Sequence, residues 1–214
     1  MPDIEFCIRN TKMSIQYILE IIGTFAFAIS GALSVKDQKH QDWFGASFTA
    51  FLCSIGGGTM RDVLLDSYPL VWISDITILY AIIAGILTTF IFYKYLIGLR
   101  RTLFLFDTFG IALFTIVGTE KALHLGVRPE IAAIMGVFTA IMGGVVRDMM
   151  NNEIPIIYRK EVYATACLAG AVSYLVLDRA GAERNVAFIV ASLVIITIRI
   201  LAVRYEWSVP KFFR

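Results

Sequence analysis

The sequence has few charged residues, few cysteines and few histidines. Charged side chains make up 17% of its 214 residues, below the roughly 25% found in soluble domains. Its three cysteines, Cys7, Cys53 and Cys167, stand far apart, which fits neither a disulfide framework nor a metal site. His40 and His124 have no cysteines or carboxylates at ligand spacing. We therefore expect no resident metal, no cofactor and no enzymatic activity.

Long apolar segments dominate what is present. Hydrophobic residues make up 58% of the chain, and a helix needs about 20 mostly apolar residues to cross a bilayer. Seven segments approach that length, although several are short or contain a charge, and six spans is the main competing count. We predict an all-α integral membrane protein in which residues 1–214 form one membrane domain. The predicted spans are 15–35, 43–65, 73–93, 103–119, 129–150, 161–177 and 186–204.

The two halves of the chain match each other at ordered positions. The segment Gly57–Asp62 (GGTMRD) corresponds to Gly143–Asp148 (GGVVRD), 86 positions later. Upstream, Glu20 corresponds to Asp107 at an offset of 87 positions. Ordered matches at nearly one offset predict an internal duplication.

Each copy of the duplication contains three predicted spans. The first copy covers 15–93 and the second 103–177, and the seventh span at 186–204 has no counterpart. Because three is an odd number, the second copy enters the membrane from the opposite side, so we predict inverted repeats. Inverted repeats recur in transport proteins, whose sites lie near the membrane midplane.

Basic residues near the span ends predict the orientation, because cytoplasmic loops carry an excess of Lys and Arg. We count seven on the side of the N-terminus and eleven on the other side. We therefore expect a protein of the inner (plasma) membrane with its N-terminus outside and its C-terminus in the cytoplasm. Since the basic residues flank the spans, the net charge of +2 is no sign of nucleic-acid binding. We expect membrane lipids as partners and no nucleic acid.

Consecutive glycines lie inside the second and fifth predicted spans. They are Gly56, Gly57 and Gly58 in the first copy, and Gly143 and Gly144 in the second. Glycine loosens a helix, and opened backbone at membrane depth is tolerated only where it is buried in protein or lines a watery cavity. We predict that these segments interrupt or kink their helices and line a pore whose gating is motion of the half-helices. The alternative is close helix packing through small residues.

An Arg-Asp pair follows the glycines by one turn in each copy. Ionisable residues inside spans are costly, so Arg61, Asp62, Arg147 and Asp148 are functional candidates. The alternative is a helix-end pair that reaches the membrane interface. At about 1.5 Å per residue, the two arginines lie near opposite membrane faces, which predicts one pair at each mouth of a pore.

The same depth count supplies each arginine with a carboxylate. Glu20 lies near the level of Arg61, and Asp107 near the level of Arg147. A charge at that depth is expensive unless it is paired, so we expect the ion pairs Glu20–Arg61 and Asp107–Arg147. The competing interpretation is that both carboxylates are free to attract cations.

The duplicated Gly-Gly-x-x-Arg-Asp segment, Lys160-Glu161-Val162 at the start of the sixth span and the three-plus-three-plus-one organisation carry a family resemblance. Over nearly its whole length the chain resembles the prokaryotic TRIC family, the trimeric intracellular cation channels. The resemblance implies a homotrimer in which each subunit has its own pore, bounded by glycine-kinked helices two and five, for monovalent cations such as potassium or sodium. In animal members the lysine of Lys-Glu-Val helps to bind an anionic inositol lipid. Arg159 and Lys160 are therefore candidates for an anionic lipid site, or a basic pair that only sets topology.

A carrier is the alternative function. Some bacterial relatives of the family are described as glycine-transporter-like, which implies a secondary transporter of a small solute such as glycine. A carrier needs a substrate-sized polar pocket, and the scarcity of polar residues in the spans favours an ion path instead. A scaffold without transport is disfavoured by the charges and glycines at matched depths. The polar candidates are Thr24, Ser30, Ser54, Thr115 and Thr119.

Overall fold

The computed structural model describes residues 15–34, 42–98, 102–159 and 162–207, and within these ranges every regular element is a helix. The prediction of an all-α protein is confirmed for this part of the chain. Seven longer helices and three short ones are described there. The longer helices are α2 (Ile15–Ser34), α3 (Trp43–Leu64), α5 (Ile76–Ile91), α7 (Thr102–His124), α8 (Pro129–Met150), α10 (Ala164–Arg179) and α11 (Arg184–Arg204), and the short ones are α4 (Val71–Ser74), α6 (Tyr93–Gly98) and α9 (Ile156–Arg159).

Local sequence explains where several helices begin. The side chain of Asp42 caps α3 by accepting a hydrogen bond from the amide of Gly45 at 2.9 Å. Asp75 caps α5 in the same way, accepting from the amide of Thr77 at 2.9 Å. Such a side chain satisfies an amide that has no partner inside the helix. Pro129 is the first residue of α8, where its missing amide hydrogen removes no helical bond.

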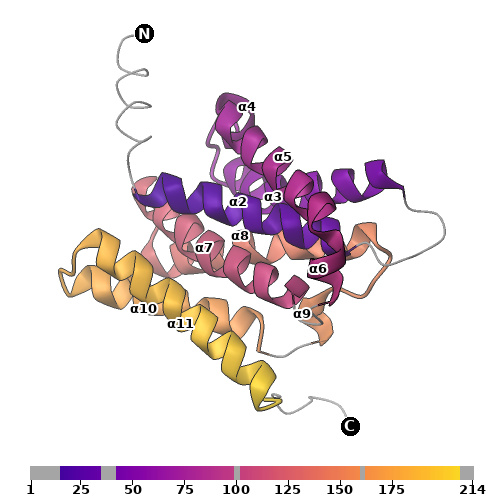
Figure 1. The fold of residues 1–214 in the computed structure, drawn as a ribbon. Coiled ribbons are helices and arrows are strands. Elements are labelled where there is room, and N and C mark those ends of the chain that lie inside the picture. Colours follow the sequence, from indigo (N-terminus) through magenta and orange to yellow (C-terminus); the bar gives the residue numbers. More distant parts are fainter. Residues whose placement is uncertain (1–14, 35–41, 99–101, 160–161, 208–214) are drawn as a thin grey trace.

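The helices form three groups that pack in order (Figure 1). α2, α3 and α5 make the first group, α7 and α8 the second, and α10 and α11 pair in the third. The first two groups are joined because α2 packs against α7 and α3 packs against α8. The pair α10 and α11 covers the other side of α7, so α7 is the most enclosed of the long apolar helices.

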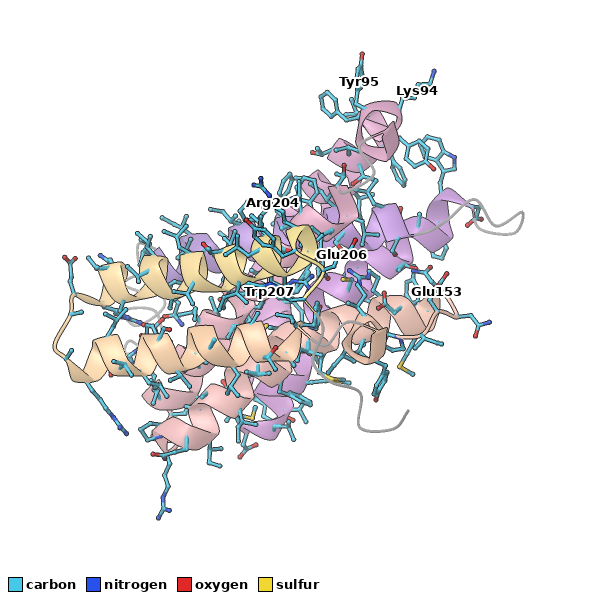
Figure 2. All side chains as sticks on the ribbon, turned by 90° about the horizontal axis from the view of Figure 1, so that it is seen from below. Lys94, Tyr95, Glu153, Arg204, Glu206 and Trp207 are labelled. Atoms are coloured by element: carbon cyan, nitrogen blue, oxygen red, sulfur yellow. The ribbon has the colours of Figure 1, made fainter. Side chains whose placement is uncertain are left out.

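The outside of the bundle suits a bilayer. By length and composition α2, α7, α8 and α11 could each cross a membrane, and α5 is apolar but shorter. Large apolar side chains project outward, among them Trp43, Phe44 and Ile91, each more than 70% exposed. Side chains also project all round the bundle in Figure 2, where Lys94 lies at the end away from the α10–α11 connection. Each predicted span coincides with one long helix, and seven crossings remain a prediction.

The turns after α3 and α8 share one backbone feature. Asp66 and Asn152 have φ of +50° and +52°, the left-handed conformation that commonly ends a helix. These two residues stand 86 positions apart, the offset of the Arg-Asp motifs. Each turn leads into a short helix, α4 or α9, which the sequence analysis did not predict.

The prediction that the glycine segments interrupt their helices is wrong, whereas a kink at these segments stays a prediction. α3 is helical without a break from Trp43 to Leu64, and α8 from Pro129 to Met150. The backbone at Gly57 and Gly143 is therefore used in intrahelical hydrogen bonds and is not opened toward a cavity. The physical reason lies in the packing of these two helices against each other, described next.

Candidate functional site

The first Arg-Asp motif belongs to a group of four charges from α2, α3 and α7, here called the Glu20 cluster: Glu20, Arg61, Asp62 and Lys121. Arg61 Nη2 lies 3.6 Å from Glu20 Oε1, which confirms the predicted ion pair. Arg61 Nε also donates to Asp62 Oδ1 at 2.7 Å, and Lys121 Nζ donates to the same oxygen at 2.8 Å. Two formal positive charges thus face two negative ones.

The second motif belongs to a matching group from α7, α8 and α11, here called the Asp107 cluster: Asp107, Arg147, Asp148 and Arg199. Arg147 Nη1 donates to Asp107 Oδ1 at 2.7 Å, which confirms the second predicted ion pair. Arg147 also donates from Nε to Asp148 Oδ1 at 2.9 Å and from Nη1 to the hydroxyl of Ser30 at 2.7 Å. Arg199 Nη2 lies 3.4 Å from Asp107 Oδ2. This cluster is also neutral as a whole.

The two clusters meet α2 at different depths. Glu20 contacts Arg61, whereas Ser30, ten residues later on the same helix, contacts Arg147. At the rise of an α-helix, ten residues cover about 15 Å. The motifs therefore lie toward opposite ends of α2, and their assignment to two pore mouths remains a prediction.

The Asp107 cluster is the drier of the two. The side chains of Asp107 and Arg147 are both 0% exposed, whereas Glu20 is 15% and Lys121 20% exposed. Charges in a dry interior interact strongly because little solvent screens them. We infer that the Asp107 cluster is held more tightly than the Glu20 cluster.

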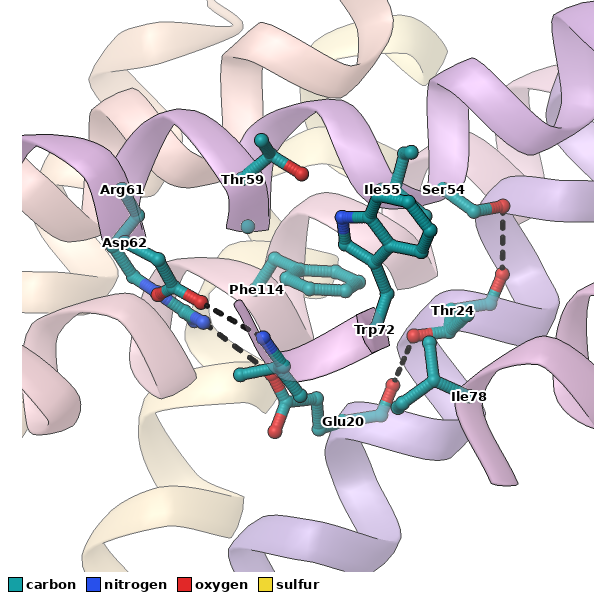
Figure 3. A pocket seen from close by; sticks show the side chains of 12 residues that line it. Glu20, Thr24, Ser54, Ile55, Thr59, Arg61, Asp62, Trp72, Ile78 and Phe114 are labelled. Carbon is teal, nitrogen blue, oxygen red and sulfur yellow. Dashed lines mark hydrogen bonds and ion pairs between the residues drawn. The ribbon is translucent and has the colours of Figure 1, made fainter. Parts of the chain in front are cut away.

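A small cavity adjoins the Glu20 cluster (Figure 3). Its volume is about 20 Å³, enough for a single water molecule. Glu20, Arg61, Thr59, Trp72 and Phe114 are among its lining residues. Both terminal nitrogens of Arg61, the hydroxyl of Thr59 and the indole nitrogen of Trp72 are buried and make no hydrogen bond to any described residue. The cavity is thus a polar site with room for water but not for a larger solute in this conformation.

The glycines let α3 and α8 approach backbone to backbone. A methyl group at Gly57 would lie 2.0 Å from the carbonyl oxygen of Thr139, and one at Gly143 would lie 2.6 Å from that of Cys53. Both distances are far inside van der Waals contact, so only glycine fits at either position. Cys53 and Thr139 are themselves 86 positions apart, so the two contacts are reciprocal. The packing alternative of the sequence analysis therefore describes these two glycines.

Of the other glycines in the two segments, Gly56 and Gly58 have looser surroundings and Gly144 does not. Gly58 lines the cavity, and a methyl group at Gly56 would lie 3.5 Å from the side chain of Val146, an ordinary contact. Gly144 faces the hydroxyl of Tyr163, which would lie 2.8 Å from an added methyl group. Gly58 is thus the glycine of the first segment that borders open space.

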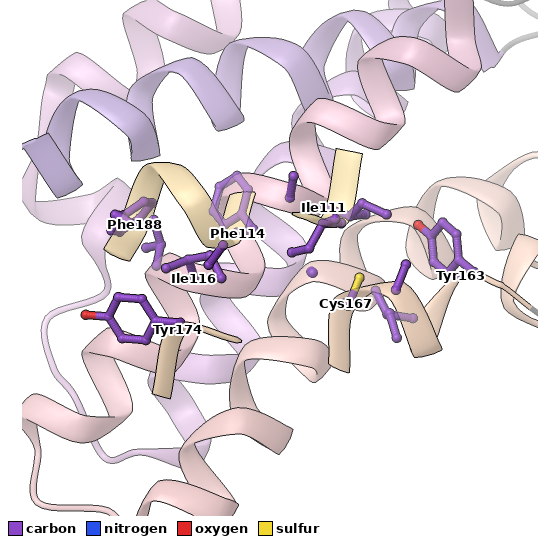
Figure 4. Close-up of a cluster of buried hydrophobic side chains, with 14 of the residues drawn as sticks. Ile111, Phe114, Ile116, Tyr163, Cys167, Tyr174 and Phe188 are labelled. Atoms are coloured by element: carbon purple, nitrogen blue, oxygen red, sulfur yellow. The ribbon is translucent and has the colours of Figure 1, made fainter. Parts of the chain in front are cut away.

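Two stacked phenylalanines lie between the levels of the clusters. The rings of Phe27 and Phe114 have centroids 5.2 Å apart and planes inclined by 17°. A methyl group on Gly110 would strike the Phe27 ring at 2.4 Å, and one on Gly23 would meet the Phe114 ring at 3.0 Å. Phe27 and Phe114 stand 87 positions apart, and so do Gly23 and Gly110. Phe114 belongs to the apolar core in Figure 4 and also lines the cavity, so it separates the cavity from the protein centre.

Most of the polar candidates within the helices donate their hydroxyl hydrogen to a backbone carbonyl of the same helix. The hydroxyls of Thr24, Thr115 and Thr119 each donate to the carbonyl four residues earlier, at 2.6 to 2.8 Å. Ser54 donates to the carbonyl oxygens of Ala50 and Thr24 at 2.9 and 3.2 Å. Hydroxyls occupied in this way do not form a substrate-sized polar pocket.

The sequence analysis did not predict all members of the two clusters. Lys121 entered only as an orientation signal and Arg199 was not singled out, although its position inside the span 186–204 is a signal of function. Tyr163, whose hydroxyl lies 3.4 Å from Asp107 Oδ1, was also missed. The predicted lipid site falls outside the described part, since Lys160 and the side chain of Arg159 are not included in it.

Comparison with known sequences identifies relatives over almost the whole chain. A UPF0126 membrane protein of Vibrio cholerae is 36% identical over 93% of this chain and 83% of the relative. The UPF0126 inner membrane protein YadS of Escherichia coli K12 is 34% identical over 92% of this chain and 95% of the relative. A family model described as "Glycine transporter" matches two segments, 17–94 and 104–179.

Solved structures share the fold. The TRIC trimeric intracellular cation channel orthologue from Rhodobacter sphaeroides has a TM-score of 0.85 and 32% identity, covering 91% of this chain and 100% of that chain. A prokaryotic TRIC channel crystallised in 0.5 M KCl has a TM-score of 0.82 and 30% identity, covering 91% and 98%. The predicted resemblance to prokaryotic TRIC channels is confirmed. The chain therefore belongs to the glycine-transporter family of membrane proteins, with UPF0126 proteins among its relatives, and it has the fold of prokaryotic TRIC channels.

Proposed function

We propose that this chain is a monovalent cation channel, permeable to potassium, with a path inside each subunit. The observation that carries the proposal is the pair of neutral, buried charge clusters placed at two levels of α2 beside the contact of α3 and α8. The shared fold with proteins described as trimeric cation channels supports it, and on that ground we propose a homotrimer. Potassium and sodium are the proposed ions.

The proposed topology is two inverted three-helix repeats, 15–93 and 103–177, followed by α11. Reciprocal contacts support it, because an inverted repeat brings equivalent residues together across a two-fold axis. Gly57 with Thr139 and Gly143 with Cys53 are one such set. The two matches of the family model begin and end close to the proposed repeats.

The described conformation fits a closed path. Between the clusters, the Phe27–Phe114 stack and the close contact of Gly57 with the Thr139 backbone would obstruct such a path. Conduction requires α3 and α8 to separate at this point, so we place the gate there. The charge clusters would set the potential at the two mouths, as charged rings do in other channels. Unpaired arginines would repel cations from the path, but Glu20 and Asp107 neutralise Arg61 and Arg147.

Orientation and lipid contact belong to the same proposal. The excess of basic residues places the N-terminus outside and the C-terminus in the cytoplasm, and a relative is described as an inner membrane protein. Arg159 and Lys160 would then face the cytoplasmic leaflet, where anionic head groups attract basic residues.

A carrier of a small solute such as glycine is the second candidate, favoured by the description of the matching family model. A carrier would alternate around a midplane site large enough for its substrate. The cavity beside Arg61 holds about 20 Å³, which suits one water and not an amino acid. That size favours the channel.

Flux through purified protein in liposomes separates the two functions. We expect potassium flux that rises with the ion gradient without saturation, collapses a membrane potential and is absent from protein-free liposomes. Saturable glycine uptake with accelerated exchange, and no conductive potassium flux, would instead establish the carrier.

A further inference from the structure

The unduplicated helix α11 is attached to α7 by two arginines. Near one end of α11, Arg184 pairs through Nε with Glu120 of α7. Near the other end, Arg199 lies 3.4 Å from Asp107 of the same helix. The acceptors are both buried, with exposed fractions of 2% for Glu120 and 0% for Asp107. The two ion pairs therefore hold α11 antiparallel to α7 from end to end.

The two arginines differ in their surroundings. The Arg184 side chain is 45% exposed and also contacts Gln16 and His124. The Arg199 side chain is 2% exposed, and its guanidinium lies 4.7 Å from the ring centroids of both Phe104 and Tyr163. Aromatic faces attract a cation most strongly where water is excluded. The Arg199 charge is thus held in one place, beside Asp107.

A count of charges shows what Arg199 adds. In the Glu20 cluster the second positive charge is Lys121 of α7. The equivalent position in the first repeat, 87 residues earlier, is Ser34, which is uncharged and accepts a hydrogen bond from Asn151 Nδ2 at 2.7 Å. Among the residues that the structure describes, the first repeat therefore provides no counterpart of Lys121 for the Asp107 cluster. Without Arg199, Arg147 alone would face two carboxylates, leaving a buried net charge of −1.

We propose that Arg199 is a positioning residue of the path: it replaces the charge that the first repeat lacks, orients Asp107 and sets the net charge of the mouth formed by the Asp107 cluster. The inference rests on the proposed function, since the mouth is that of the proposed path. It also assigns a task to α11, which lies outside both repeats. That task is electrostatic as well as structural.

Charge variants test this role in planar bilayers. Arg199→Gln leaves a net negative mouth, and a charged mouth concentrates counter-ions. The current ratio, defined as cation current entering through this mouth divided by cation current leaving through it, should therefore rise by at least about twofold. Arg199→Lys should keep the wild-type current ratio. Arg184→Gln is the matched control, since it removes the other α7 anchor without touching the Asp107 cluster, and it should leave the current ratio unchanged. Adding Asp107→Asn to Arg199→Gln restores neutrality and should restore the ratio.

The result that overturns the proposal is a wild-type current ratio in Arg199→Gln, or the same shift in Arg184→Gln. A second measurement does not depend on conduction. Thermal unfolding of Arg199→Gln, Asp107→Asn and the double variant should be strongly non-additive, as expected for groups in contact. Additive losses of stability would overturn the proposed role of Arg199 even if the protein is a carrier. Non-additive losses in a protein that conducts no ions would reject the proposed channel function and leave the Arg199–Asp107 interaction in place.

Discussion

Phe27 stacks on Phe114, and the two residues stand 87 positions apart at equivalent places in the two halves of the chain. Each ring rests on a glycine of the opposite helix, Phe27 on Gly110 and Phe114 on Gly23. The pair therefore interlocks α2 with α7 between the levels of the two charge clusters. A methyl group on Gly143 of α8 would lie 3.4 Å from the Phe27 ring, so the pair adjoins the proposed gate.

Removal of one ring should loosen this constriction. We expect Phe114→Ala to raise the open probability or conductance several-fold, and to lower stability by about 3–5 kcal/mol, the usual range for a buried phenylalanine. Planar-bilayer recording and thermal unfolding measure the two effects. Phe188→Ala is the control, because Phe188 is 0% exposed in the same core but packs against Tyr174, away from the cavity. Equal conductance in both variants would show that the stacked pair is packing alone.

Two neighbouring glycines should respond differently to the same substitution. Gly57→Ala places a methyl group 2.0 Å from the Thr139 carbonyl oxygen and must push α3 from α8, at a cost of about 1–3 kcal/mol or more. Gly58→Ala meets only the far end of Arg61 at 3.8 Å, so it should fold like the wild type. Because Gly58 lines the cavity, its alanine variant should still reduce conductance. Melting temperature together with single-channel current checks both expectations, and a stable Gly57→Ala would contradict the described helix contact.

The two carboxylates of the predicted ion pairs should differ in their contribution to stability. Asp107→Asn leaves Arg147 and Arg199 buried with one carboxylate fewer, and breaking a buried pair costs about 3–5 kcal/mol. Glu20 is partly exposed and lies farther from its arginine, which keeps Asp62 as a partner, so Glu20→Gln should cost less than Asp107→Asn. Denaturation of the purified variants in detergent compares them. Equal losses would contradict the drier environment assigned to the Asp107 cluster.

Thiol labelling in whole cells tests the proposed orientation. Glu183→Cys and Lys94→Cys are made in a background in which the native cysteines are replaced by alanine. Both positions are exposed. Glu183 belongs to the α10–α11 connection, and Lys94 lies at the other end of the bundle (Figure 2). An impermeant thiol reagent should label residue 183 from outside and residue 94 only after the cells are opened. The reverse pattern would place the N-terminus in the cytoplasm.

Depth along a helix could be predicted from the sequence, whereas the direction of a side chain could not. Constant helical rise placed Glu20 level with Arg61 and Asp107 level with Arg147, and both pairs are present. The part played by Arg199 depends on which face α11 turns toward α7, and that is decided by packing between segments far apart in the sequence.

The glycine segments show a second limit of the sequence. An absent side chain is needed equally for an opened backbone and for close helix contact, so Gly57 is compatible with both. Only the position of the Thr139 carbonyl oxygen distinguishes them, and it favours contact. The proposed closed conformation could not be predicted from the sequence, because it depends on the same contact between α3 and α8.

Recording from the purified protein in a planar bilayer under a potassium chloride gradient is the decisive test of the proposed channel. We expect discrete unitary currents that reverse close to the potassium equilibrium potential, with currents altered by Gly58→Ala and Phe114→Ala. A bilayer that stays silent while the same preparation shows saturable glycine uptake in liposomes would contradict it.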